Sequence, residues 1–250
     1  MNDCALRNRL YFLAFLIVSL FANRMVMAAA PVDTEVFNLQ CDNAVNPLGI
    51  DARTPQFSWN IRSTRRNMRQ NAYQILVADD PEKLSPEQAN IWNSGKVRSA
   101  QSAGVLYRGK PLESRKRYYW KLLLWDAQGA EPVSSAVAYF EMGLLQERDW
   151  SGDWVGFPSG WIGRVHYFRR VFSFAKTIKR ARAYVAGIGY SEMEINGKKV
   201  GDHVLDPATS NFSKTVYYTT YDIKEYLQKD NAMVIAVAPG WYGMPKLRMQ

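Results

Sequence analysis

The sequence predicts an all-β protein built from two consecutive β-sandwiches. Most of the chain consists of short runs that alternate polar with apolar residues and are bounded by Pro, Asn or Asp, a pattern typical of half-buried strands. No alternation of strands with long amphipathic helices is present, which disfavours a parallel α/β sheet. With 250 residues, of which 47% are hydrophobic and 22% charged, the chain is globular and has apolar material for one or two cores.

Residues 1–30 have the pattern of a secretory signal peptide. Arg7 and Arg9 precede the apolar run Leu10 to Phe21, and small residues follow at 28–30, where we expect cleavage. A membrane span needs about 20 apolar residues, and this run has about a dozen. The leader therefore predicts export to the periplasm or the exterior, without stable membrane insertion after cleavage.

The first sandwich is expected to span residues 31–148. The run Tyr118 to Trp125 carries more aromatic residues than a surface strand needs, which places it in the core between two sheets. Asp79 to Leu84 predicts only a short capped turn. The other strands expected here are Gln56 to Ile61, Ala72 to Val77 and Ala136 to Phe140.

The second sandwich is expected to span residues 149–250, because strand alternation breaks between Glu141 and Trp154. Asn196-Gly197 predicts a hairpin with a type I′ turn, which requires positive φ at both central positions. Asp222 is expected to cap a short helical turn. The expected strands are Val165 to Phe174, Arg180 to Val185, Ser191 to Ile195, Val216 to Tyr221 and Ala232 to Ala238.

The last five residues, Lys246 to Gln250, again alternate polar with apolar side chains, as at the start of a strand. We therefore expect the second sandwich to be truncated and the chain to be a fragment. A sandwich without one of its strands would expose unpaired backbone groups and apolar core positions.

Composition excludes several classes of site. The four Cys and His residues, Cys4, Cys41, His166 and His203, match no metal-ligand spacing, so we expect no metal. Cys41 has no partner in the exported chain and is expected to be a buried apolar residue. No phosphate-binding glycine motif is present, and we expect no cofactor.

A net charge of +9 would suit nucleic acid, an anionic surface or neither. The basic residues Arg62, Arg65, Arg66 and Arg69 lie in a connection rich in Ser, Thr and Asn. For an exported protein we interpret them as a solvated loop and expect no nucleic-acid partner.

Hydrolytic chemistry has few candidates. Asp202, Asp206 and Asp222 could contribute to a pair of glycosidase carboxylates, but their positions favour turn and cap roles. His166 and His203 lack a serine elbow, so a Ser-His-Asp site is disfavoured. We assign no catalytic residue.

Sugar binding has better candidates, because aromatic rings stack on the C–H faces of sugars while loop side chains supply polar contacts. The candidate substrate-binding residues are Trp161, Trp241, Tyr242 and Asp206. The alternative is that the aromatic residues only close the ends of the sandwiches.

Segments throughout residues 31–250 resemble the amino-terminal region of bacterial α-L-rhamnosidases of glycoside hydrolase family 78. They occur in the same order as in that region, which makes the resemblance specific. The segments are Asn46 to Asp51, Ala72 to Ala78, Trp92 to Val97, Tyr118 to Lys121, Phe140 to Leu145, Gly187 to Tyr190, Ile195 to Asp202, Val204 to Pro207, Thr220 to Asp222 and Gly240 to Gly243.

The resemblance implies a fibronectin-III-like sandwich followed by a jelly-roll-like sandwich. It also implies that the catalytic residues lie in an (α/α)₆ barrel that follows these sandwiches and is absent from this chain. The chain would then be the accessory part of an exported enzyme that hydrolyses terminal α-L-rhamnosyl residues with inversion. The alternative is a stand-alone exported protein that binds rhamnose-containing glycans without catalysis.

Overall fold

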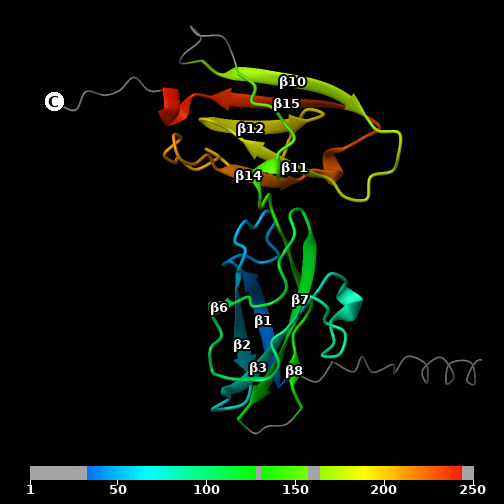
Figure 1. Cartoon of the computed structure of the whole chain (residues 1–250), viewed down its shortest axis with the longest axis vertical. Helices are drawn as coiled ribbons and strands as arrows, with labels where there is room; N and C mark the ends of the chain where they lie inside the picture. The colour runs from blue at the N-terminus through cyan, green and yellow to red at the C-terminus, as the bar shows by residue number, and fades with distance from the viewer. Residues whose placement is uncertain (1–32, 128–130, 157–163, 244–250) are drawn as a thin grey trace, which may run out of the picture.

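A computed structural model describes residues 33–127, 131–156 and 164–243, and these residues form two β-rich lobes stacked end to end (Figure 1). Four short 3₁₀ turns are the only helical elements among them, which confirms the prediction of an all-β protein. The predicted signal peptide at 1–30 and the strand expected at Lys246 to Gln250 lie outside the described residues. Within the described ranges no helix has the length and apolar character needed to cross a membrane.

The first lobe contains two antiparallel sheets. The smaller sheet has the order β1-β2-β6, and the larger has the order β4-β3-β7-β8, with β5 also paired to β3 and β9 to β7. Their bounds are β1 Thr34–Cys41, β2 Gln56–Ser63, β3 Gln70–Ala78, β4 Trp92–Asn93, β5 Val97–Arg98, β6 Val105–Leu106, β7 Arg117–Asp126, β8 Val133–Ser134 and β9 Ala138–Glu141.

The core of this lobe lies between the two sheets, where alternate residues of β7 are buried. Tyr118, Trp120, Leu122 and Leu124 are each 0% exposed, and Trp120 packs against Phe57 of β2 with ring centroids 4.6 Å apart. The aromatic run therefore occupies the core, as predicted, because every second side chain of a strand points to the same face.

Cys41 ends β1 in the same core with 1% exposure, which confirms it as a buried apolar residue. Burial, with a smaller contribution from the Asp42 charge, raises the pKa of the Cys41 thiol. The thiol is therefore protonated and unreactive at neutral pH.

The second lobe has a four-stranded sheet of order β10-β15-β12-β13 and a two-stranded sheet of β11 and β14. Met193, Ile195 and Tyr221 are buried in a small core to which both sheets contribute. The bounds are β10 His166–Ser173, β11 Arg182–Ala186, β12 Tyr190–Ile195, β13 Lys198–Lys199, β14 Tyr218–Asp222 and β15 Asp230–Ala238.

One local prediction in this lobe is confirmed, and a second is corrected. Asn196 and Gly197 connect β12 to β13 with φ values of 54° and 74°, as a type I′ turn requires. The predicted short turn is present as the 3₁₀ turn η3 (Lys224–Tyr226), but its N-cap is Ile223 and not Asp222, and no side chain caps it. Asp222 lies one residue earlier, where its carboxylate accepts a hydrogen bond from the N–H of Lys224 at 3.2 Å.

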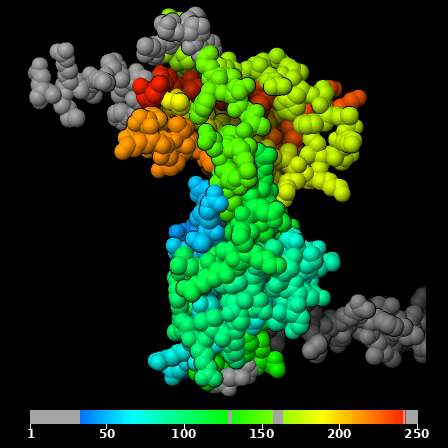
Figure 2. Space-filling model, viewed as in Figure 1, coloured from blue at the N-terminus to red at the C-terminus, as the bar shows by residue number. Residues whose placement is uncertain are grey.

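The two lobes meet at a narrow waist, where loops of the first lobe, drawn in light blue, and the chain after β9, drawn in green, touch the second lobe (Figure 2). Glu141, the last residue of β9, lies in this waist with its side chain 1% exposed. Its carboxylate binds Arg182 of β11 at 2.7 Å and Arg117 of β7 at 3.1 Å. Arg180 lies 3.7 Å from the same carboxylate. One buried acid therefore joins strands of both lobes.

Two glycines allow the backbones to approach closely beside this ion-pair cluster. A Cβ atom on Gly49 would overlap the side chain of Thr220, and one on Gly143 would overlap the hydroxyl of Tyr218. The same hydroxyl accepts a hydrogen bond from the N–H of Leu144 at 2.9 Å. The waist is thus a packed joint.

The Glu141→Gln variant should lower the free energy of unfolding by at least about 2 kcal/mol, because the buried guanidinium of Arg182 loses its buried carboxylate partner and keeps only the half-exposed Asp222. Urea unfolding followed by circular dichroism measures the loss. The matched control is Glu35→Gln, which breaks a pair with Arg62 whose side chains are 40% and 66% exposed. This control should cost less than about 1 kcal/mol. Equal effects of the two substitutions would show that the Glu141 cluster contributes no more than a surface pair.

Candidate functional site

Two of the four predicted sugar-binding residues can be placed, and both lie at the same end of the second lobe. Asp206 is in the loop between β13 and β14, and Tyr242 is in the 3₁₀ turn η4, Gly240–Gly243, which follows β15. Trp241 belongs to the same turn by its backbone, and Trp161 lies outside the described residues. Both the Asp206 loop and the η4 turn lie next to the beginning of β12. The carbonyl of Asp206 accepts a hydrogen bond from the N–H of Ser191, and Gly240 packs against the ring of Tyr190.

Glycines at the start of β12 permit this arrangement. Gly189 has φ 113°, and a Cβ atom there would overlap the carbonyl oxygen of Ala238. A Cβ atom on Gly187 would lie 2.9 Å from the hydroxyl of Ser191. Gly187 and Gly189 have no side chain. The loop that carries Asp206 and the end of β15 can therefore both lie close to Tyr190 and Ser191 at the beginning of β12.

The polar groups of Asp206 are used within the protein. Its Oδ2 atom accepts hydrogen bonds from the hydroxyl of Tyr221, at 3.0 Å, and from that of Thr219. His203 Nδ1 lies 3.4 Å from the same oxygen. The backbone carbonyl of Asp206 accepts from the N–H of Ser191 at 2.6 Å. Asp206 therefore fastens its loop to both sheets of the second lobe.

Burial raises the pKa of the Tyr221 hydroxyl, and the hydrogen bond and charge of Asp206 raise it further. The phenol is therefore protonated across the neutral range and acts as a donor to the carboxylate. This pairing satisfies a hydroxyl on a residue that is only 8% exposed.

Tyr242 is 62% exposed, and its ring meets that of Phe212 edge to face at 5.5 Å. The loop before Asp206 adds two exposed apolar side chains, Val204 at 76% and Leu205 at 71%. Sequence analysis did not identify Phe212, Val204 or Leu205 as candidates. For Val204 and Leu205, the signal that could have indicated them is an apolar pair in a predicted loop.

The three aspartates considered for hydrolysis have different surroundings. Asp202 is exposed. Asp222 pairs with Arg182 at 2.8 Å in the joint between the lobes. Asp206 is held by the hydroxyl donors Thr219 and Tyr221 of β14. Of the candidate groups, the exposed ring of Tyr242 in contact with Phe212 is therefore the one suited to contact one face of a sugar ring, and the Asp206 carboxylate has a structural role.

Two family matches cover most of the chain in consecutive order. Residues 36–146 match the family described as "Rha78A-like, N-terminal immunoglobulin domain". Residues 176–249 match the family described as "Alpha-L-rhamnosidase N-terminal domain".

Curated relatives give the same result. An "Alpha-L-rhamnosidase" of Formosa agariphila is 40% identical over 222 residues, which cover 79% of this chain and 23% of that protein. An "Alpha-L-rhamnosidase" of Alteromonas sp. (strain LOR) is 35% identical over 212 residues, with 79% and 23% covered. The chain thus spans about a quarter of the length of the curated relatives it matches.

Solved structures agree in fold. The α-L-rhamnosidase from Dictyoglumus thermophilum superposes with a TM-score of 0.77 and 37% identity, covering 83% of this chain and 25% of that one. The enzyme from Aspergillus terreus superposes with a TM-score of 0.68 and 25% identity, covering 84% and 24%.

The Asp206→Ala variant should lower the free energy of unfolding by about 2 kcal/mol, because the buried hydroxyl of Tyr221 loses its acceptor. Chemical denaturation measures the change. Asp202→Ala, an exposed aspartate four residues earlier, is the matched control and should change stability by less than about 0.5 kcal/mol.

A double-mutant cycle separates this clamp from other effects of the substitution. Tyr221→Phe should be destabilising in the original chain and nearly neutral in the Asp206→Ala background, since the hydroxyl has already lost its partner. Fully additive costs would contradict the clamp.

Proposed function

This chain corresponds to the amino-terminal region of α-L-rhamnosidases of glycoside hydrolase family 78, and we propose that it is the accessory part of an exported enzyme that hydrolyses terminal α-L-rhamnosyl residues of glycans. The observation that carries the proposal is the pair of family matches, one over most of the first lobe and the next over most of the second. The catalytic (α/α)₆ barrel of such an enzyme is not covered by this chain.

The finer architecture is part of the proposal. We assign residues 31–148 to a fibronectin-III-like sandwich and residues 149–250 to a jelly-roll-like sandwich, with residues 1–30 as the signal peptide for export. The apolar core shared by the two sheets of each lobe supports a sandwich in both cases. Export is supported by the leader pattern, in which Arg7 and Arg9 precede an apolar run and small residues follow it.

An accessory role also agrees with the joint between the lobes. Glu141 and its arginines hold the second lobe in one orientation on the first. In the whole enzyme, the two lobes would then act as a rigid support that presents the loops of the second lobe.

A second candidate function is that of a carbohydrate-binding protein without catalysis. The specific observation in its favour is the exposed ring of Tyr242 beside Phe212. The two functions are compatible in one enzyme, because a weak sugar-binding surface can accompany a separate catalytic domain.

The chain by itself should not release 4-nitrophenol from 4-nitrophenyl α-L-rhamnoside above a buffer blank. Inverting hydrolysis needs an acid and a base on opposite faces of the sugar, and Asp206 and Asp222 are engaged by other partners. The matched sample is the same chain extended by the coding sequence downstream of codon 250, which should encode a helical barrel and restore turnover. Turnover by the chain alone that disappears in Asp206→Ala, or a downstream sequence that encodes no barrel, would overturn the accessory role.

Rhamnose should bind the second lobe weakly, with a Kd on the order of millimolar, because a shallow surface with one or two rings buries little area. In ¹H–¹⁵N spectra, rhamnose should shift amide signals of the Gly240–Gly243 turn, and Tyr242→Ala should abolish these shifts. Tyr167→Ala is the control, since Tyr167 is also exposed, at 67%, but lies on β10. Shifts that persist in Tyr242→Ala would place the binding surface elsewhere.

A further inference from the structure

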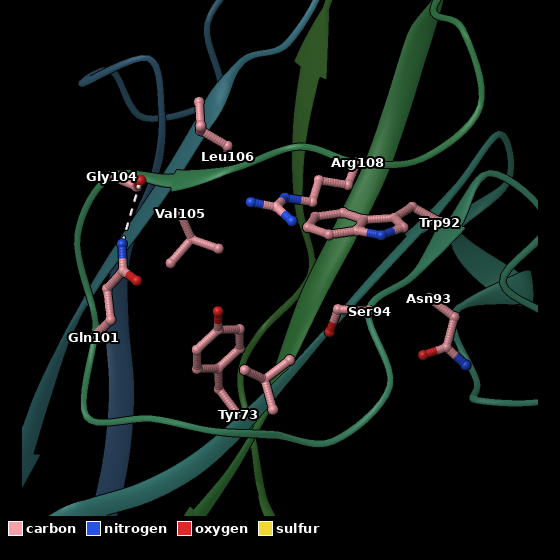
Figure 3. A pocket seen from close by; sticks show the side chains of 10 residues that line it. Tyr73, Trp92, Asn93, Ser94, Gln101, Gly104, Val105, Leu106 and Arg108 are labelled. Atoms are coloured by element: carbon pink, nitrogen blue, oxygen red, sulfur yellow. Dashed lines mark hydrogen bonds between the residues drawn. The ribbon is translucent and has the colours of Figure 1, made fainter.

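The first lobe contains a pocket of about 500 Å³ that neither the sequence analysis nor the proposed function uses. It lies where the two sheets separate at one edge of the sandwich, between β6 of the smaller sheet and β4 and β5 of the larger one (Figure 3). This volume falls within the range of small-molecule sites, and it is sufficient for a single sugar unit. The residues that line it include Tyr73, Trp92, Asn93, Ser94, Gln101 and Arg108.

Two of the polar lining residues are already occupied by contacts within the protein. The side-chain oxygen of Asn93 accepts from Gln74 at 2.7 Å and from the N–H of Gly95 at 2.9 Å. The hydroxyl of Ser94 accepts from the N–H of Ile75 and donates to the carbonyl of Gly95, both at 2.8 Å. These residues shape the pocket wall and have little capacity left for a ligand.

Three other polar side chains have hydrogen-bonding groups that remain available on the pocket side. Gln101 donates its amide nitrogen to the carbonyls of Ala103 and Gly104, which leaves its amide oxygen on the pocket side (Figure 3). The Tyr73 hydroxyl and the Arg108 guanidinium also point into the space (Figure 3). Over the described ranges of the chain, no carboxylate lies within salt-bridge distance of Arg108.

Burial and the positive charge of Arg108 both influence the pKa of the Tyr73 hydroxyl. Burial raises the pKa of the Tyr73 hydroxyl, and the nearby positive charge of Arg108 opposes part of that rise. Among the residues that the structure describes, the Arg108 guanidinium thus has no carboxylate partner, and it lines the same pocket as a neutral hydroxyl donor, Tyr73.

The aromatic wall of the pocket is rigid. Trp92 is partly buried, and it packs edge to face on Tyr107 at 5.2 Å and beside Phe57 at 5.9 Å. A Cβ atom on Gly109 would overlap both Trp92 and Tyr107, so the residue after Arg108 must be small for the wall to form. A fixed indole is the side chain on which the C–H face of a sugar stacks best.

The segment that supplies most of the pocket lining is basic. Residues 88–112, which supply most of the lining, contain no Asp or Glu and four basic residues, Lys96, Arg98, Arg108 and Lys110. Such a segment attracts anions and disfavours cationic ligands.

We propose that this pocket binds an acidic saccharide, with the carboxylate or sulfate of the sugar on Arg108 and one face of the ring against Trp92. Tyr73 then donates to a ring hydroxyl, and the Gln101 amide oxygen accepts from another. An arginine without a counter-ion forms charge-assisted hydrogen bonds with carboxylates and sulfates. This site is distinct from the Tyr242 surface and does not depend on the proposed function.

The test uses the full chain and a matched pair of ligands, methyl β-D-glucuronoside and methyl β-D-glucoside, which differ at C6 by the carboxylate. The indole N–H signal of Trp92, assigned with a Trp92→Phe variant, reports binding in ¹H–¹⁵N spectra. The glucuronoside should bind at least about tenfold more tightly than the glucoside. Glucose 6-sulfate, titrated in parallel, distinguishes a sulfate from a carboxylate as the preferred acidic group.

Two variants assign the effect to Arg108. Arg108→Gln should weaken glucuronoside binding at least about tenfold, whereas Arg98→Gln, the same charge change on the exposed end of β5, should change it less than about twofold. Thermal unfolding checks that both variants fold. Equal affinity for the two glycosides, an unchanged affinity in Arg108→Gln, no saturable shift of Trp92, or equally tight binding of inorganic sulfate alone would each overturn the proposal.

Discussion

The buried carboxylate of Glu141 is the constraint on which the arrangement of the two lobes depends. Removing a carboxylate from water is costly unless ion pairs and hydrogen bonds replace its hydration. Arg117 supplies one partner from the first lobe, and Arg182 and Arg180 supply the others from the second. Glu141 therefore keeps only Arg117 if the lobes separate and gains the arginines of the second lobe when they dock, so the joint stabilises one relative orientation.

Strand β14 connects this joint to the loop of Asp206, because its side chains alternate between two faces. Tyr218 contacts Leu144, Thr220 meets Gly49, and Asp222 pairs with Arg182, all at the joint. The intervening residues Thr219 and Tyr221 donate to Asp206. A displacement at the joint would therefore displace the hydroxyls that hold the loop, which links the accessory role of the first lobe to the surface of the second.

Local patterns were sufficient for the strands that alternate regularly and insufficient where pairing is irregular. β7 and the Asn196-Gly197 hairpin followed directly from residue order, since periodicity and positive φ are properties of neighbouring residues. β1 was not predicted. Its register with β2 shifts between Phe37 and Gln40, and Asn38 has φ 50°, so the alternation is interrupted within the strand. Strands of two residues, such as β4 and β6, are too short to have any period.

The sequence by itself determined the all-β class, the order of the two units and the aromatic core strand, because these depend on side-chain alternation and turn chemistry within short segments. Only the tertiary structure decided which polar residues act together. Asp202 and Asp206 both lie in the connection that follows the Asn196-Gly197 hairpin, yet Asp206 is bound by β14 and Asp202 is exposed. Likewise Tyr73 and Arg108, 35 residues apart in the chain, line one pocket only once the two sheets have packed together. Hydrogen bonding and desolvation depend on distances in space, and residues far apart in the chain acquire those distances only when the sheets pack.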